Sequence, residues 1–326
     1  MLNQPTVISN QPNLALKRGA RLDSLFRGST YLTAFIVFGS VIGILITLVI
    51  GAYPALQKFG FGFLTSSAWN PVTQDFGAAV AIFGTLVTST IALIIAVPVS
   101  FGIALFITQM APNWLKRPIG TAVELLAAIP SIIYGMWGLF VFAPIFADNV
   151  QPWITDHFGG LPFIGVLFDG PPMGIGMFTA GLILAIMIIP FIASIMRDVF
   201  DVVPTVLKES AYGLGATTWE VVWNIVLPYT RVGVIGGIML GLGRAMGETM
   251  AVTFVIGNAQ RISPSLFMPG NTISSTLANE FTEAVGKLYT SALIELGLIL
   301  FLITFVVLAL AKLLLMRLEA SSGQRS

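Results

Sequence analysis

The chain has 326 residues, of which 56% are hydrophobic and only 10% are charged, and its formal net charge is +1. A soluble protein of this length would have too little polar surface, so the composition excludes the ordinary soluble classes and favours a membrane protein. The near-neutral charge excludes nucleic acid as a partner held by bulk electrostatic attraction. The sequence has no cysteine, which excludes a disulfide framework and a thiolate metal site.

Six apolar stretches are long enough to cross a membrane, because about 20 helical residues span about 30 Å of hydrocarbon. Prolines inside the second, third and fourth stretches predict kinks or tilts there. The sequence therefore predicts an all-α polytopic membrane protein. Its six transmembrane helices are expected at residues 30–52, 78–107, 120–146, 175–197, 232–257 and 289–316.

Residues 1–29 are polar and basic and show no periodic apolar face, so we expect a mostly irregular tail, helical at most near residues 22–26. A cleaved signal peptide is not expected, because the first apolar run is too long and follows almost 30 polar residues. No repeat of 20–50 residues is visible, so one transmembrane domain is expected at 30–316, with a tail at 317–326.

The basic residues predict an orientation for the six helices. Of the 16 Lys and Arg residues, the great majority lie on the side of the two termini, and Arg244 lies inside the fifth stretch. By the positive-inside rule, both termini and the loop at 198–231 face the cytoplasm. The loops on the opposite side, at 53–77, 147–174 and 258–288, are rich in Gly, Pro, Trp and Phe, which favours ordered segments on the membrane face.

A polar segment, KESAYGLGATTWEVVWNIVLPYTR, separates the fourth and fifth stretches at residues 208–231. Its pattern predicts a short amphipathic helix that a second protein can bind. A glycine is expected at the end of this helix, where it allows a close approach or a sharp turn, and a proline marks a break before the fifth span. The alternative is an ordinary cytoplasmic interfacial loop. The residues assigned to docking are Glu209, Ser210, Ala211, Gly215, Ile225, Leu227 and Pro228.

Arg244 and Glu248 place two charges within the fifth stretch. An arginine near the middle of a transmembrane helix costs about 2.5–3.5 kcal/mol on insertion scales, so it is expected to face the protein interior or a wet cavity. At this i, i+4 spacing the Cβ atoms of the two residues lie roughly 5–6 Å apart, close enough for the carboxylate to occupy the guanidinium while no anion is bound. The guanidinium fork also suits a tetrahedral oxyanion, to which Thr249 and Thr253 could add hydroxyls. A purely structural ion pair remains the alternative.

Two further glutamates lie near or within apolar spans. Glu124 is expected near the cytoplasmic end of the third span and Glu295 near the outer end of the sixth, where each can reach an interface and serve a structural role.

Patterns that carry catalysis are missing from the sequence. No G-x-x-x-x-G-K-[ST] phosphate loop occurs, so we expect no ATP site in this chain. The single histidine, His157, is expected to be a surface residue in an outward loop, and it supports neither a metal site nor a Ser-His-Asp arrangement. We therefore expect a subunit that is not an enzyme.

The spacing E-x-A-x(3)-G-x(9)-I-x-L-P from Glu209 to Pro228 resembles the EAA loop of ABC importer permeases, the short helix that seats in the ATP-hydrolysing subunit. Three further stretches, AAIPSIIYG, GRAMGETMAVTFVIGN and LFMPGNTISSTLANEF, resemble the PstC family of phosphate ABC importer permeases. The similarity runs from about residue 75 to 316. Ser210 departs from the alanine in the name of the EAA loop, a small residue for a small residue.

The resemblance implies a type I ABC importer permease in the bacterial inner membrane, with inorganic phosphate as the solute. It implies four kinds of partner besides the lipid bilayer: a PstA-type permease subunit, a PstB-type ATPase dimer, a periplasmic phosphate-binding protein and phosphate itself. ATP and Mg would be bound by the ATPase subunits, and no cofactor by this chain. The family's intramembrane Arg and Glu fall on Arg244 and Glu248.

Other functional classes fit the sequence less well. A secondary transporter would usually show two homologous halves or several intramembrane carboxylates. A membrane-embedded enzyme would need a cluster of His, acidic or nucleophilic residues at one depth. Within the favoured class, sulfate and molybdate permeases are the nearest rivals.

Overall fold

The structure is a computed structural model that describes residues 14–162 and 164–323, and the chain divides into two units, residues 1–50 and 51–326. In the first unit the described residues belong to one helix, α1 (Leu14–Phe59), which continues into the second unit. Residues 14–29 are part of this helix, so the expected irregular tail is wrong for them. Leu, Ala, Lys and Arg are good helix formers, and extending an existing helix requires no new nucleus. Residues 1–13 of the expected tail lie outside the described part.

Six helical segments of the described chain are long and apolar enough to cross a membrane, which confirms the expected number and the all-α class. Four of them, at 22–59, 79–110, 177–201 and 287–317, include or nearly coincide with the expected spans. The third runs over 131–158 and the fifth over 218–246, so the expected boundaries of these two spans are wrong.

The third span is displaced because Pro130 separates two helices. α4 (Asn113–Ala127) ends before it, and α5 (Ser131–Trp137) begins directly after it. A proline disfavours the helical conformation at the residue before it, here Ile129. The span then continues through η2 (Gly138–Phe142), α6 (Ala143–Ile145), η3 (Phe146–Val150) and α7 (Gln151–Phe158). Glu124 therefore lies on the separate helix α4 and not at the end of a span.

The fifth span is displaced because its helix passes through Pro228 and stops at Gly247. It comprises α10 (Thr218–Val221), the π-helical turn η5 (Val222–Val226) and α11 (Leu227–Met246). A π-helical turn widens the backbone ahead of the proline and relieves the clash of its ring with the preceding turn. The expected break at Pro228 is therefore absent, and the break falls between α11 and α12 (Met250–Thr253).

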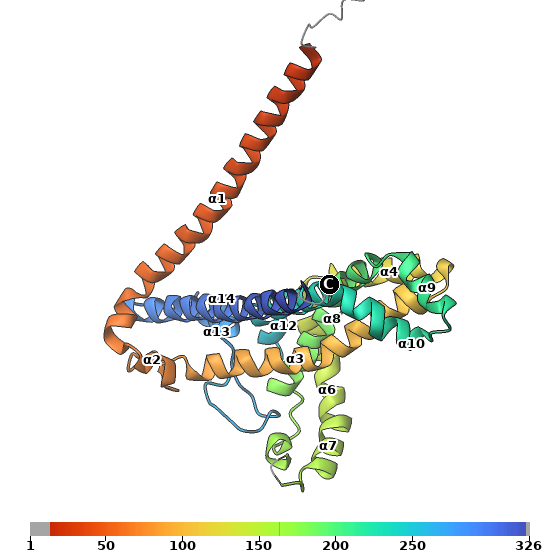
Figure 1. Cartoon of the computed structure of the whole chain (residues 1–326). Helices are drawn as coiled ribbons and strands as arrows, with labels where there is room; N and C mark the ends of the chain where they lie inside the picture. Colours follow the sequence, from red (N-terminus) through yellow and green to blue (C-terminus); the bar gives the residue numbers. More distant parts are fainter. Residues whose placement is uncertain (1–13, 163, 324–326) are drawn as a thin grey trace, which may run out of the picture. The chain divides into compact units, whose positions relative to one another are not determined.

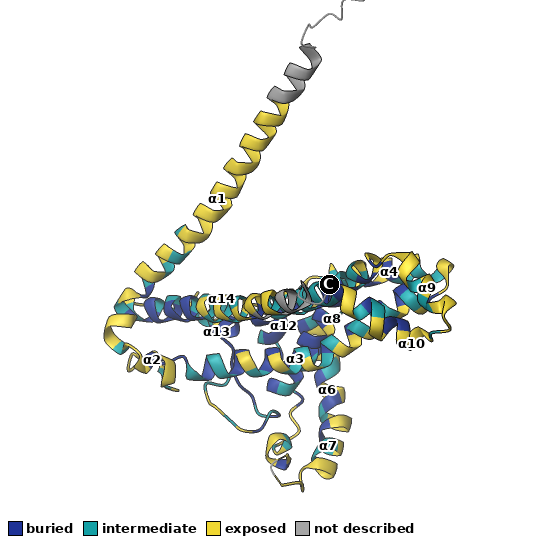
Figure 2. Cartoon of the chain, viewed as in Figure 1, coloured by how far each residue is buried: buried dark blue, intermediate teal, exposed yellow. Residues whose placement is uncertain are grey.

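Helix α8 (Met177–Asp201) lies at the centre of the second unit. α3 (Ala79–Leu105) packs along it and is followed by the π-helical turn η1 (Phe106–Met110), while α11 and α4 also contact α8 (Figure 1). Most residues along α8 are buried, as the colouring of Figure 2 indicates, and they supply much of the main hydrophobic core. The residues of α8 in this core include Ile183, Leu184, Ile188, Ile192 and Met196.

A second core lies where the loop segments meet the start of α14 (Lys287–Gly323). There α2 (Gly62–Thr65) precedes a short antiparallel pair, β1 (Trp69–Asn70) and β2 (Asp75–Phe76), and the ring of Phe76 stacks on Tyr289 at 5.1 Å between centroids. The loops between the spans also carry η4 (Gly165–Phe168) and α13 (Ile273–Glu280), so they contain ordered elements. Glu295 in α14 is only 2% exposed, so the expectation that it reaches an interface is wrong.

Gly84 allows α3 to approach the loop before α13 closely. A Cβ atom at this position would lie 1.9 Å from the carbonyl oxygen of Asn271. In the same contact the backbone N–H of Ile273 donates to the hydroxyl of Thr85 at 3.0 Å. The absence of a side chain at Gly84 therefore allows the approach, and the hydrogen bond to Thr85 holds the loop against α3.

Candidate functional site

Arg244 lies in the last turn of α11 and is half-buried. The unpaired carbonyl groups at the C-terminal end of a helix carry partial negative charge, which stabilises a cation in the last turn. The helix end thus supports a charge that the apolar sequence around it would disfavour.

The guanidinium group of Arg244 packs on an aromatic ring. Its Cζ lies 5.3 Å from the ring centroid of Phe191 on α8, within the range of a cation–π interaction. Its Nε is buried and has no hydrogen-bond partner among the described residues. A buried donor without an acceptor is unfavourable, so this N–H gains free energy from any oxygen that reaches it.

Glu248 is not paired with Arg244. Salt bridges of the described chain join Arg197 to Glu124 and to Asp198, and none joins Arg244 to Glu248. The expected ion pair presumed a continuous helix, whereas α11 ends at Met246 and Glu248 lies in the break. There its Oε1 accepts a hydrogen bond from the backbone N–H of Ala251 at 3.3 Å, which holds the start of α12.

Thr249 lies at this break and Thr253 ends the short helix α12 that follows it, and both are half-buried. Their hydroxyls donate to backbone carbonyl oxygens, Thr249 to Gly247 at 3.4 Å and Thr253 to Thr249 at 2.7 Å. The structure therefore brings Arg244 and the three other residues assigned to the solute pathway into one short stretch where a span is interrupted. A hydroxyl can exchange a local acceptor for another oxygen without a backbone change.

The segment assigned to docking forms helix α9 (Thr205–Gly213), and none of the residues of this helix is buried. Glu209 and Ser210 are exposed, while Ala211 is half-buried against the main core. The apolar side expected for this amphipathic helix, with Leu207, Ala211, Leu214 and Val222, is only partly formed, because Leu214 lies beyond the end of α9 and is 90% exposed. α9 is therefore a surface helix anchored by few contacts.

Gly215 turns the chain between α9 and α10. Its φ of +90° lies in the left-handed region that favours glycine, and a Cβ atom there would meet no other group. Of the two roles that the sequence allows for this glycine, a close approach or a sharp turn, the structure has the turn. Thr217 then begins α10 with a capping box, in which Glu220 accepts from the Thr217 backbone N–H at 2.8 Å.

The remaining docking residues lie on the helix that starts at this cap. Ile225 is in η5, and Leu227 and Pro228 are in the first turn of α11. Ile225 and Leu227 pack against the main core. On the same helix, Trp219 and Trp223 stack at 5.3 Å and are more than half exposed. The segment therefore presents an aromatic pair beside α9.

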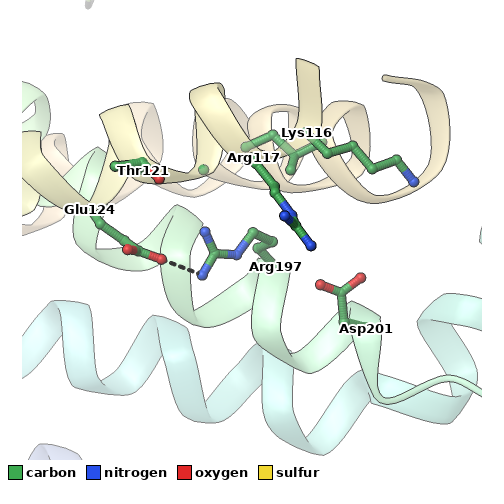
Figure 3. Close-up of a pocket in the computed structure, with 8 residues that line it drawn as sticks. Lys116, Arg117, Thr121, Glu124, Arg197 and Asp201 are labelled. Atoms are coloured by element: carbon green, nitrogen blue, oxygen red, sulfur yellow. Dashed lines mark hydrogen bonds and ion pairs between the residues drawn. The ribbon is translucent and has the colours of Figure 1, made fainter. Parts of the chain in front are cut away.

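A pocket of about 330 Å³ with charged walls lies between α4 and the end of α8 (Figure 3). The end of α8 is followed closely in the sequence by α9. Arg197 donates through Nη2 to Glu124 on α4 at 2.7 Å and to Asp198 at 2.8 Å. Figure 3 shows the side chains of Arg117 and Asp201 facing the same space. These contacts tie α4 to the helix that leads into α9.

Sequence reasoning missed two of these residues as parts of a site. In the sequence, Arg197 is one of the basic residues that predict the orientation of the helices, and nothing marks it further. The signal that was available is the polar face of α4, where its partner Glu124 lies. Phe191 gave no signal, because it is one of many apolar residues of α8.

The family model for the binding-protein-dependent transport system inner membrane component matches residues 96–320. The chain is 61% identical to the phosphate transport system permease protein PstC of Pasteurella multocida, over 93% of this chain and 95% of the relative. It is 59% identical to the protein of the same name from Mesorhizobium japonicum, over 98% of this chain and 97% of the relative.

Solved structures show the same fold at low sequence identity. A chain of a bacterial alginate ABC transporter, in complex with an alginate-bound periplasmic protein, matches with a TM-score of 0.57 and 18% identity, covering 91% of this chain and 94% of that one. A chain of the inward-facing MetNI methionine ABC transporter matches with a TM-score of 0.51 and 15% identity, covering 72% and 91%. With 61% identity over nearly the whole length and an ABC importer permease fold, the chain belongs to the PstC family of the binding-protein-dependent transport system inner membrane components.

Proposed function

We propose that this chain is the membrane-spanning permease subunit of an ATP-driven importer of inorganic phosphate in the bacterial inner membrane. The observation that carries the proposal is the identity of about 60% with proteins named phosphate transport system permease protein PstC, over nearly the full length of both chains. The six apolar helices supply the membrane-spanning part.

Arg244 is the proposed contact for phosphate. Its guanidinium remains charged in apolar surroundings and presents a planar set of donors that matches two oxygens of a tetrahedral anion. Phe191 fixes the position of the guanidinium, and Nε has no acceptor among the described side chains and backbone groups. Thr249 and Thr253 provide hydroxyls at the same break.

Glu248 is proposed to assist release. It keeps the break in place through the N–H of Ala251 and adds a negative charge to the region that phosphate passes. A transport site must hold its ion weakly enough to let it leave, and a carboxylate near the path limits the affinity by repulsion. This role differs from direct competition for Arg244, because the two residues form no ion pair in the described chain.

Coupling to ATP hydrolysis is proposed at α9 and the turn that follows it. Glu209, Ser210 and Ala211 would contact the ATPase, while Gly215 shapes the turn. One helical span, 218–246, leads from this turn to Arg244. At 1.5 Å per residue that distance is about 39 Å along the helix, so a displacement of the turn moves Arg244 as part of the same rod.

The complete importer would contain a second permease subunit of the PstA type, a PstB-type ATPase dimer and a periplasmic phosphate-binding protein. The ATPase subunits would bind ATP and Mg, and this chain would need no cofactor of its own. A periplasmic protein delivers phosphate to the outward loops, and closure of the ATPase pair then moves α9 and alternates access to the Arg244 region.

The experiment that tests the proposal is solute uptake by the assembled complex in liposomes. With ATP on the side of the ATPase and loaded binding protein on the other, radioactive phosphate should accumulate, and omission of ATP should abolish the uptake. Sulfate and molybdate serve as comparison solutes. Uptake of each is measured both without a binding protein and with the binding protein for that anion. Accumulation of either anion without accumulation of phosphate would refute the assignment of the solute.

A further inference from the structure

Glu295 is a buried acid that the proposed transport cycle does not use. It lies within the membrane-spanning helix α14 and is 2% exposed. Its Oε2 atom has no hydrogen-bond partner in the part of the chain that the structure describes. A carboxyl group buried without a donor is unfavourable, and acids within transmembrane helices usually have a partner.

Glu295 lines a pocket of about 310 Å³ on the flank of α14. Leu298 and Ile299, each 7% exposed, lie beside it, and Leu302 extends the lining further along the helix. These four residues occupy positions i, i+3, i+4 and i+7, so they form one stripe on the helix surface. The opposite wall comes from the end of α1, including Leu56, and from α2. We call this pocket the Glu295 groove.

We propose that the Glu295 groove receives a transmembrane helix of the second permease subunit, and that this helix brings a hydrogen-bond donor to Glu295. The assignment rests on the proposed function, which requires that subunit. Side chains at these spacings form ridges along which helices pack against one another, and polar side chains form hydrogen bonds across helices in membranes. The acyl chain of a lipid could fill the apolar part of the groove but has no donor for the carboxyl group.

Substitution of Glu295 separates this role from a structural one. In the isolated full-length chain, Glu295→Leu removes a carboxyl group that lacks a donor, so thermal stability in detergent should stay equal or increase. In the heterodimer the same substitution removes the acceptor of the partner's donor, so the dissociation constant should rise about tenfold. A residue that only supports the fold of its own chain should not, when substituted, leave the stability of the isolated chain equal or higher and at the same time weaken the heterodimer.

A second pair of variants tests the groove without changing the acid. Leu302→Trp places a large ring in the groove and should weaken the heterodimer, whereas Val166→Trp, at an exposed position of η4 outside the six candidate spans, should leave it unchanged. The heterodimer is measured in nanodiscs by energy transfer between the two labelled permease subunits. Glu295→Gln keeps an acceptor oxygen and should retain most of the wild-type affinity.

The outcomes also distinguish the groove from the proposed function. If the wild-type chain forms no heterodimer and imports no phosphate with its partners, the proposed function fails. If the wild-type heterodimer forms and transports, but Glu295→Leu and Leu302→Trp both associate normally, the groove assignment alone is overturned. It is also overturned if the two variants no longer bind a lipid, or no longer form a homodimer, while their affinity for the second permease subunit is unchanged.

Discussion

The Cζ atom of Arg244 lies 5.3 Å from the ring centroid of Phe191, so a cation at the end of α11 rests on an aromatic residue of the central helix α8. The ring contacts one face of the guanidinium and leaves its edge, where the N–H groups lie, for an anion. The buried Nε–H has no acceptor within the described residues. This arrangement gives the clearest test of the solute site.

Arg244→Lys should lower ATP-driven phosphate uptake by about tenfold or more, because an ammonium group keeps the charge but loses the paired hydrogen bonds of the planar fork. The measurement is the initial rate of uptake into liposomes that contain the assembled complex. Arg261→Lys is the matched control at an exposed position outside the six candidate spans, and it should transport normally. Normal uptake by Arg244→Lys would remove Arg244 from the proposed phosphate contact.

Glu209→Lys should weaken binding of the ATPase subunits, by about tenfold if the acid meets a basic group there, because the substitution reverses the charge of an exposed residue on α9. Co-purification of the ATPase with the permease pair measures this effect. Capture of phosphate by the separate binding protein should not change. Glu283→Lys, an exposed acid in a segment predicted to face outward, is the control. Equal recovery of the ATPase with Glu209→Lys would argue against docking at α9.

Gly215→Ala should destabilise the turn after α9 by about 1–2 kcal/mol, because a left-handed backbone brings Cβ close to the next carbonyl oxygen. Gly213→Ala is the control, since this glycine ends α9 and its Cβ would also meet no other group. Thermal unfolding of the purified chain and stimulation of ATP hydrolysis by the binding protein report the effect. Stability and stimulation equal to those of Gly213→Ala would show that the left-handed conformation is not required.

Gly84→Ala should destabilise the chain by about 1–3 kcal/mol, because the added methyl group overlaps the carbonyl of Asn271 and forces a backbone shift. Gly102→Ala on the same helix is the control, because a Cβ there meets nothing within 4 Å. The midpoint of thermal unfolding in detergent measures both. An unchanged midpoint for Gly84→Ala would contradict the close approach of α3 to this loop.

The number of spans could be predicted from the sequence because crossing a membrane requires long apolar runs, and such runs are visible without a structure. The boundaries of the third and fifth spans could not. Apolar residues continue across Pro130 and Gly247, so hydropathy alone does not show where the helices end. The helix through Pro228 depends on a π-helical turn, which has no simple sequence signal.

The candidate site was only partly predictable for a similar reason. Arg244 is conspicuous as a charge within an apolar run, whereas its contact with Phe191 arises from the packing of α11 on α8. The expected pairing with Glu248 assumed helical geometry that the break at Gly247 removes. Glu295 was expected near an interface, but the second core buries the start of α14, and Glu295 faces only the Glu295 groove.

The central claim is that phosphate travelling through the permease reaches Arg244, and a cysteine at Thr249 tests it most directly. The natural chain has no cysteine, so Thr249→Cys gives it a single thiol at the break beside Arg244. In the assembled complex during ATP hydrolysis, a small anionic thiol reagent should modify this cysteine, and saturating phosphate with its binding protein should slow the modification. The protection should disappear when Arg244→Lys is added. A thiol that never reacts, or that reacts equally fast with and without phosphate, would contradict the account.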